Sequence, residues 1–413
     1  GANDVVAVHG SNSGETTGRE LAKMIPEYYE FSCPVKIVSG LKALSQLPYE
    51  MDLAGCRRAL VITDAGVVKA GLIKRVEAVF AGTDTEIGAI YDQTPPDSST
   101  AVVNAAAKLF QDTSCDCFVA VGGGSCIDTA KGANILVAEG TNDLLQFQGA
   151  ERVTKPLKPS IVIPTTAGTG SEVTLVAVIH DEERHVKIAL TSYRLLPNVA
   201  ILDPKMTLTM PPKITAATGM DALTHAIEAY YGLQKNPVSD AFAATAIQLI
   251  RKHLITCVEH GDDENARLAM ANAALCAGIA FSNSMVGVVH ALAHSCGAVA
   301  RIPHGVANAV LLPWGMESNL DKAAAHIAEL APMLGAPASG SSREKAAAAI
   351  QAVRDLGKQL NNCCELPTTL KAAGVADDQL EIIAKAAIND GAVTYNPEAV
   401  TFEDALQLLR NAY

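Results

Sequence analysis

The strongest constraint on the fold is a change of pattern about halfway along this 413-residue chain. In the first half, short runs rich in β-branched residues alternate with segments of helical periodicity, which is typical of parallel βαβ units. The runs expected to form strands are 59–64, 86–92, 117–125, 159–166 and 199–204. From Met206 onward, strand patterns largely disappear and Ala-rich amphipathic segments follow, such as 240–254 and 343–360.

This change of pattern predicts two domains, because a chain of this length exceeds one ordinary hydrophobic core. We expect an α/β domain with a parallel sheet over residues 1–205 and an all-helical domain over residues 206–413. Residues 1–26 form an N-terminal extension of the first domain. Thr17 and Glu20 within it have the spacing of a capping box, which predicts a short helix there.

Composition excludes several classes of protein. Hydrophobic residues make up 49% of the chain and charged residues 18%, which is typical of a well-buried globular protein. The net charge of −12 and the absence of Lys/Arg runs argue against a nucleic-acid partner. The uncharged stretch 268–300 could mimic a membrane helix, but its Asn, Ser and His residues favour a buried helix pair and no membrane partner. The ten cysteines lack disulfide-framework spacing and paired CxxC motifs, which favours free thiols and a cytoplasmic protein.

A glycine-rich loop follows the third predicted strand, in the segment VGGGSCIDTAKG at 121–132. Glycines permit positive φ and close approach of the backbone to a ligand, and the N–H groups of a following helix can bind phosphate. Ser125 and Asp128 are spaced as the N-cap and third residue of that helix. Three glycines also occur in ordinary tight turns, so this loop alone leaves both interpretations open.

Two further loops favour nucleotide binding. Asp64 follows a predicted strand in ALVITDAG, where a carboxylate can bind ribose hydroxyls and repel a 2′-phosphate. The alternative is that Asp64 only caps the turn at Ala65–Gly66. The loop PTTAGTGSEVT at 164–174 follows another strand and adds hydroxyls and glycines. Together the three loops predict a dinucleotide site in the α/β domain.

The helical half carries a second group of polar residues. In TGMDALTHAIEAYYG, Asp221 and His225 are four residues apart and therefore share one helix face. His290 and His294 have the same spacing in GVVHALAHSCGA, and His304 follows. A single buried histidine is more often a satisfied core residue than a ligand, but five such side chains in two matched segments favour a metal site. One carboxylate with two or three imidazoles suits Fe²⁺ or Zn²⁺, whereas Ca²⁺ and Mg²⁺ prefer oxygen ligands.

A dinucleotide site combined with a metal site predicts hydride transfer with Lewis-acid activation of an alcohol or carbonyl. The motifs GGGSCIDTAK, PTTAGTGSE, TGMDALTHAIEAY, GVVHALAHSCGA and RIPHGVANAVLLP closely resemble the iron-dependent (group III) alcohol dehydrogenase family, over about Phe31 to Tyr413. The resemblance implies a dehydroquinate synthase-like architecture, with a dinucleotide-binding α/β domain and a metal-binding helical domain. It also implies NAD and Fe²⁺, or Zn²⁺ in its place, as cofactors, and a short-chain primary alcohol or its aldehyde as substrate. A homodimer or higher homo-oligomer is expected.

The resemblance further implies roles for individual residues. The metal ligands fall on Asp221, His225, His290 and His304, while His294 matches a histidine that faces the nicotinamide and substrate and can relay a proton. Asp64 matches the ribose-binding carboxylate, and the pyrophosphate loop falls on Gly122, Gly123, Gly124 and Ser125. Asp128, in the helix that follows this loop, is also expected to take part in cofactor binding. The residues that match positions near the ribose and nicotinamide are Thr165, Thr166, Thr169 and Lys187. The substrate pocket falls on Val176, Phe281 and Ala392. The chain departs from the family at Pro95-Pro96-Asp97, where many members read P-N-P, which leaves one contact near the adenine in doubt.

Three other interpretations compete with this one. Glycerol dehydrogenases and dehydroquinate synthases have a similar architecture and bind a metal, but the spacing of Asp221 and His225 favours the alcohol dehydrogenases. A dehydroquinate synthase also needs a basic pocket for its phosphorylated substrate, and the sparsely basic second half offers none that the sequence reveals. A non-catalytic nucleotide-binding protein would have no need for the complete ligand set.

Overall fold

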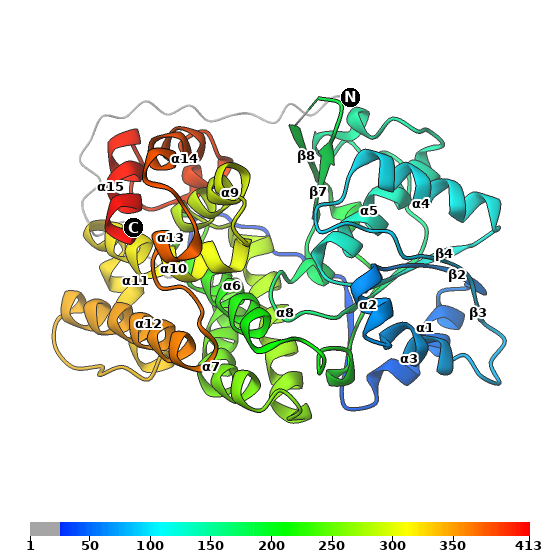
Figure 1. The fold of residues 1–413 in the computed structure, drawn as a ribbon, viewed down its shortest axis with the longest axis horizontal. Coiled ribbons are helices and arrows are strands. Elements are labelled where there is room, and N and C mark those ends of the chain that lie inside the picture. The colour runs from blue at the N-terminus through cyan, green and yellow to red at the C-terminus, as the bar shows by residue number, and fades with distance from the viewer. Residues whose placement is uncertain (1–24, 185) are drawn as a thin grey trace.

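The computed structural model describes residues 25–184 and 186–413, which form an α/β half and a helical half lying side by side (Figure 1). The predicted extension over residues 1–26, with its capping box at Thr17 and Glu20, lies almost entirely outside the described residues. The predicted combination of a parallel-sheet domain with an all-helical domain is confirmed.

The α/β half is built on a six-stranded sheet with the order β1-β9-β6-β4-β2-β3, in which all neighbouring strands are parallel. The strands are β1 (Lys36–Ser39), β2 (Arg58–Ile62), β3 (Glu86–Tyr91), β4 (Cys117–Gly122), β6 (Ser160–Pro164) and β9 (Val199–Leu202). All five predicted strands are present, and each is shorter at its carboxyl end than predicted. β1 was not predicted, because its four residues carry no distinct hydrophobic run.

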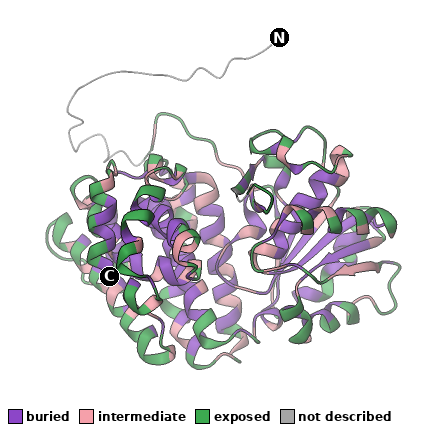
Figure 2. Ribbon diagram, turned by 45° about the horizontal axis from the view of Figure 1, so that its top comes forward, coloured by how far each residue is buried: buried purple, intermediate pink, exposed green. Residues whose placement is uncertain are grey.

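Both faces of this sheet are buried, as expected for a parallel sheet. Alternate residues of β2 and β4 point to opposite faces: Leu60 and Phe118 join one core, whereas Val61 and Val119 join the other. The helices of this half are α1 (Leu47–Leu53), α2 (Ala65–Lys69), α3 (Leu72–Ala78), α4 (Thr100–Asp112) and α5 (Gly124–Glu139). The first core includes α4 and α5, and the second includes α1 and α3. Figure 2 shows the buried residues along the strands between these helices.

A second, three-stranded sheet lies against the α/β half and was missed by the sequence analysis. It has the order β5-β8-β7 and consists of β5 (Gly149–Ala150), β7 (Val176–Asp181) and β8 (Val186–Thr191). β7 and β8 pair antiparallel, and four residues separate them in the sequence. The prediction read this half only as βαβ units, so a direct hairpin was not considered.

The second half is all-helical, as predicted. Its helices are α6 (Pro212–Tyr231), α7 (Pro237–Glu259), α8 (Glu264–Ser284), α9 (Val288–Ala300), α10 (His304–Ser318), α11 (Leu320–Met333), α12 (Ser342–Cys364), α13 (Leu370–Ala373), α14 (Leu380–Ala387) and α15 (Phe402–Ala412). The short 3₁₀ helices of the chain are η1 (Ala43–Gln46), η2 (Leu144–Phe147), η3 (Ser171–Val173), η4 (Tyr193–Leu195), η5 (Pro204–Met206), η6 (Asp377–Gln379) and η7 (Gly391–Tyr395). The strands end at β9 and the long helices begin at α6, while the boundary between residues 205 and 206 stays a prediction.

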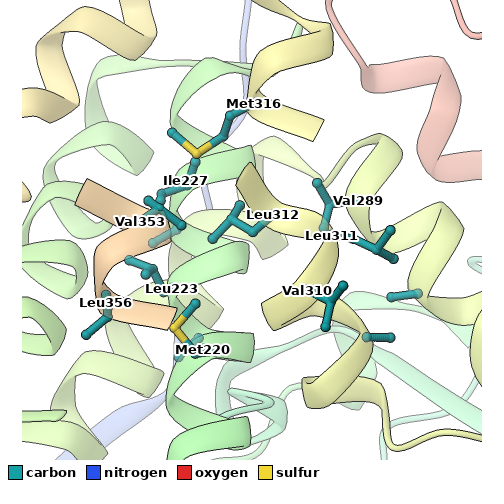
Figure 3. Close-up of a cluster of buried hydrophobic side chains, with 14 of the residues drawn as sticks. Met220, Leu223, Ile227, Val289, Val310, Leu311, Leu312, Met316, Val353 and Leu356 are labelled. Carbon is teal, nitrogen blue, oxygen red and sulfur yellow. The ribbon is translucent and has the colours of Figure 1, made fainter. Parts of the chain in front are cut away.

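Helix α6 is the central element of the helical half. Pro212 is its first residue. Proline is favoured at this position, because an N–H group there would have no hydrogen-bond partner within the helix. Almost every later residue is buried, and Figure 3 shows Met220, Leu223 and Ile227 among side chains of α10 and α12. A helix enclosed on all sides can direct polar residues only toward other protein groups or a bound ligand, because no face is open to water.

Helices α8 and α9 cover the uncharged stretch 268–300, which confirms the predicted helix pair. Among the described residues, no single helix is long and apolar enough to cross a membrane. α8 and α9 meet that requirement only when taken together, and they are bent by 105°.

Met285 connects α8 to α9 with φ 66° and ψ −178°. Only glycine adopts this backbone region readily, and another residue there costs about 1–3 kcal/mol. Met285→Gly should therefore raise the free energy of unfolding by about 1 kcal/mol, because the greater freedom of glycine in the unfolded chain offsets part of the relief. Urea unfolding checks this value. Met285→Ala retains the Cβ atom and is the matched control. An equal gain in the free energy of unfolding in both variants would show that the backbone at Met285 is not strained.

Candidate metal and nucleotide site

The three predicted nucleotide loops lie at one edge of the sheet. β2, β4 and β6 are adjacent and parallel, so their carboxyl ends bring together Asp64, the glycine loop and Thr165. The Thr165 amide donates to the Gly122 carbonyl at 3.0 Å. The side chain of Thr166 lies 3.5 Å from the point where a Cβ atom on Gly123 would stand. Thr169 accepts a hydrogen bond from the Ser171 hydroxyl at 3.0 Å, within the loop that follows β6.

The glycine loop leaves the start of α5 accessible. A Cβ atom on Gly122 would lie 2.4 Å from the sulfur of Cys126, so this position cannot hold a larger residue without rearrangement. Gly123 is the N-cap of α5, and no side chain caps the helix. The prediction of Ser125 as N-cap is wrong, because the extended backbone of Gly123 starts the helix earlier. Ser125 lies in the first turn, where its hydroxyl donates to the carbonyl of Pro96. The N–H groups of this turn have no side-chain cap to satisfy them, which favours binding of an anion.

Asp64 is the N-cap of α2, so the capping alternative is realised. Its Oδ1 accepts a hydrogen bond from the Val67 amide at 2.9 Å. Its Oδ2 accepts from the Cys126 thiol at 3.3 Å, which places the carboxylate directly beside the glycine loop. A ribose-binding role is compatible with this position and stays a prediction.

Two charged residues of α5, the partly buried Asp128 and the buried Lys131, hold the segment around the start of β7. Asp128 accepts a hydrogen bond from the Val178 amide at 3.1 Å, and burial raises its pKa to about 6. Lys131 was missed by the sequence analysis. Burial lowers the pKa of Lys131 to about 8, and its Nζ donates at 2.7–3.0 Å to the carbonyls of Ser171, Thr174 and Val176. Lys131 therefore links α5 directly to the predicted pocket residue Val176 by a hydrogen bond.

A cavity of about 110 Å³ lies beside the first turns of α5. Three residues of the predicted nucleotide site line it, namely Ser125, Asp128 and Lys187. Lys187 Nζ lies 3.8 Å from Oδ1 of Asp97, which also lines the cavity. Both side chains are more than half exposed, so this ion pair can open to admit a ligand.

The four predicted metal ligands converge in the helical half. Asp221 and His225 come from α6, His290 comes from α9, and His304 is the first residue of α10. One ligand atom from each lies within 4.8 Å of all the others. The Nε2 atoms of the three histidines are 3.8, 3.7 and 3.4 Å from Asp221 Oδ1, in sequence order. A single cation can therefore contact all four side chains.

Glu228 orients one of these ligands and was not assigned a role by the sequence analysis. Its Oε2 lies 2.7 Å from His290 Nδ1, and its Oε1 accepts from the Val289 amide at 2.8 Å. Because the carboxylate accepts the Nδ1 proton, Nε2 of His290 is left to face Asp221. The available signal was its spacing, since Glu228 lies seven residues after Asp221 and so shares its helix face.

The contacts of Asn308 indicate that the four predicted metal ligands suit a cation. Its side-chain NH₂ lies 2.8 Å from Asp221 Oδ1, 3.3 Å from His290 Nε2 and 3.1 Å from His304 Nε2. Its own Oδ1 is buried without a hydrogen-bond partner. Three side-chain atoms that can bind a cation thus converge on one weakly positive group, and the carbonyl of Asn308 is left unsatisfied. This arrangement of one carboxylate and three imidazoles suits Fe²⁺ or Zn²⁺.

Protonation of the cluster also suits a cation. Burial would raise the pKa of Asp221, but the surrounding histidines outweigh it and hold this pKa well below its usual range. Burial lowers the pKa of His225 to about 3, so this imidazole is neutral near pH 7. Burial also opposes a charge on His290, but Asp221 and Glu228 raise its pKa to about 9. A metal bound at this imidazole would therefore displace a proton.

His294 lies beside the four predicted metal ligands and is not one of them. Its ring stacks on His304 with the centroids 5.3 Å apart, and 49% of its side chain is exposed. Its Nδ1 is 2.8 Å from Oδ2 of Asp390, which fixes the ring. The other oxygen of Asp390 accepts from the amide of Ala392 at 2.8 Å. Asp390 is 96 residues from His294, so no local sequence pattern could reveal this pair.

The structure brings two of the three predicted pocket residues to this cluster. The ring of Phe281 stacks on His225 with the centroids 4.2 Å apart. Ala392 is linked to His294 through Asp390. Val176 begins β7 on the α/β side, where Lys131 holds its carbonyl.

Comparison with known proteins assigns the chain to a family. The family model for iron-containing alcohol dehydrogenase matches residues 34–204. The family model for the C-terminal part of the Fe-containing alcohol dehydrogenase family matches residues 215–413. The chain belongs to the iron-containing alcohol dehydrogenase family. It is similar to NAD-dependent methanol dehydrogenase of Bacillus methanolicus, with 37% identity over 92% of the chain and 99% of that protein.

Solved structures of iron-containing alcohol dehydrogenases and related enzymes share the fold. One is a 1,3-propanediol oxidoreductase, with a TM-score of 0.90 and 37% identity over 94% of this chain and all of that one. Another is a sulfoacetaldehyde reductase from Bifidobacterium kashiwanohense in complex with NAD⁺, with a TM-score of 0.84 and 28% identity over 94% of this chain and 99% of that one.

The contact between Glu228 and His290 generates a prediction for metal affinity. Glu228→Gln preserves the shape of the side chain but removes the charge that favours the Nδ1 proton, so metal affinity should fall about 10- to 100-fold. Competition with a chelator measures the affinity. Glu50→Gln alters another buried carboxylate, paired with Lys36 in the α/β half, and should leave the affinity unchanged. Equal affinities of the Glu228→Gln and parent proteins would show that Glu228 does not support the ligand.

Proposed function

We propose that this protein is an iron-dependent, NAD(H)-dependent alcohol dehydrogenase that interconverts a short-chain primary alcohol and its aldehyde. The convergence of Asp221, His225, His290 and His304 within 4.8 Å carries the proposal. The uncapped start of α5 beside Asp64 supports dinucleotide binding in the other half. The named activities of the similar methanol dehydrogenase and 1,3-propanediol oxidoreductase, and the NAD⁺ complex of the reductase, support the reaction class. A cytoplasmic homodimer or higher homo-oligomer stays a prediction.

The proposed reaction gives separate roles to the metal ligands, to the pair of His294 with Asp390, and to Phe281. Asp221, His225, His290 and His304 would hold a cation that would supply Lewis-acid activation of the substrate oxygen, and NAD(H) would supply the hydride acceptor or donor. His294 is half exposed beside the cluster, and Asp390 stabilises a proton on its Nδ1, so this pair can move a proton between substrate and solvent. Phe281 covers His225 with an apolar ring and excludes water from that side.

Replacement of His304 tests the function most directly. His304 is the most exposed of the ligands, with 39% of its side chain accessible, so His304→Ala should not disturb the core. We expect this variant to lose most of its bound metal and nearly all turnover, while NADH binding measured by fluorescence is retained. His260→Ala removes an exposed histidine elsewhere and should have no effect. Parent-like metal content and turnover in His304→Ala would refute the proposed ligand set.

Asp64 is proposed to select NAD(H) over NADP(H), because a 2′-phosphate beside it would meet like charge. At about 4 Å and an effective dielectric near 20, one pair of unit charges repels by roughly 4 kcal/mol, which solvent reduces. Even a third of that energy gives about tenfold discrimination. Asp64→Asn preserves the cap of α2 but removes the charge, and Asp64→Gly costs little as an N-cap. Both variants should narrow the NADH/NADPH ratio of kcat/KM, chiefly by improved use of NADPH. An unchanged ratio would show that Asp64 does not select the cofactor.

The pocket is proposed to favour a simple primary alcohol over a vicinal diol. Val176, Phe281 and Ala392 offer no side-chain donor or acceptor for a second hydroxyl group. Burying such a hydroxyl without a partner costs binding energy, so kcat/KM for 1-butanol should exceed that for 1,2-propanediol by at least about tenfold. Val176→Asn adds an amide and should narrow the difference. Steady-state kinetics with both alcohols measure the ratio, and a preference for the diol in the parent protein would refute this view of the pocket.

A further inference from the structure

A second group of metal-binding side chains lies at the opposite end of the sheet from the nucleotide loops. Cys56 is close before β2, Cys117 is the first residue of β4, and Asp116 precedes it directly. These two strands are adjacent and parallel, with Ala59 opposite Cys117, so their starting ends meet at one edge. Their carboxyl ends carry Asp64 and the glycine loop at the other edge.

The three side chains satisfy the distance requirement for one cation. One sulfur or oxygen atom from each of Cys56, Asp116 and Cys117 lies within 4.8 Å of the others. Both thiols are buried, with exposed fractions of 2% and 1%. The Cys56 thiol donates to the carbonyl oxygen of Ala54 at 3.6 Å, and this oxygen is a candidate fourth ligand. The sequence analysis missed this group because its cysteines are 61 residues apart, outside any CxxC pattern.

The carboxylate is held in place and is reachable from solvent. Oδ2 of Asp116 accepts a hydrogen bond from the Arg57 amide at 2.8 Å, and Oδ1 accepts from the Arg58 amide at 3.0 Å. These bonds fix the carboxylate beside the thiols, as outer contacts do in metal sites, and each oxygen keeps a further lone pair. Asp116 is partly exposed, which provides an entry path to the buried sulfurs.

We propose that Cys56, Asp116 and Cys117 form a second metal site that binds one Zn²⁺ or a similar thiophilic divalent cation. Two thiolates and a carboxylate match the ligand preference of Zn²⁺, and the Ala54 carbonyl or a water completes four-coordination. On binding, two S–H bonds break, two sulfur–metal bonds form, and both protons leave to solvent without any change of oxidation state. The bound cation would fasten the segment after α1 to the start of β4.

Cd²⁺ is a suitable probe, because its thiolate complexes absorb in the ultraviolet and the first metal site has no sulfur ligand. Titration of the reduced enzyme with its catalytic cation retained should develop this band with one equivalent of Cd²⁺ per chain. Cys56→Ser/Cys117→Ser should abolish the band, and metal analysis should show one bound cation fewer than in the parent protein. Asp116→Asn leaves the buried core unchanged and should weaken Cd²⁺ binding at least about tenfold.

Cys115→Ser is the matched control, because Cys115 is also buried but packs in the core on the other face of the sheet. This variant should retain the band. Persistence of the band in Cys56→Ser/Cys117→Ser, its loss in Cys115→Ser, or parent-like affinity in Asp116→Asn would overturn the proposal. Absence of any band in the reduced parent protein would do the same. If a mild two-electron oxidant then joined Cys56 to Cys117 as a disulfide, taking up two electrons while both thiol protons left to solvent, the pair would be a redox-active dithiol and not a metal site.

Discussion

The buried contact between Glu228 and His290 is the interaction on which the rest of the metal site depends. An ionised carboxylate inside a helical core is costly unless it is fully hydrogen-bonded, and Glu228 meets this requirement with the His290 ring and the Val289 amide. The same contact fixes the start of α9 against α6. His290 therefore faces Asp221 and His225, and His294, one turn later on α9, is placed beside the cluster.

The two halves of the molecule position their predicted site residues in different ways. The parallel sheet brings the carboxyl ends of its strands to one edge, so the short loops with Asp64, Gly123 and Thr165 meet there. The helical half instead holds its polar residues on enclosed helices, where rotamers are restricted by packing. The strained backbone of Met285 joins α8, which carries Phe281, to α9, which carries the predicted metal ligand His290.

Much of this arrangement was predictable because it is local in sequence. Strands of β-branched residues and the four-residue spacing of Asp221 with His225 identify the sheet and the ligand helix without knowledge of tertiary contacts. Asp390, Lys131 and Cys56 could not be predicted, since their partners are distant in sequence or are backbone carbonyls. Ser125 was wrongly predicted as a helix cap, because an extended glycine starts α5 without any side chain. The β7–β8 hairpin was missed where a βαβ pattern was assumed.

Removal and restoration of the metal test the central claim most directly. We expect chelation to abolish alcohol oxidation while NADH binding persists, because the predicted metal ligands and the predicted nucleotide loops lie on different elements. Addition of one equivalent of Fe²⁺ per chain should restore activity in the parent protein but not in His304→Ala. Full alcohol oxidation by protein shown to contain no metal, or equal restoration of both proteins, would contradict the account.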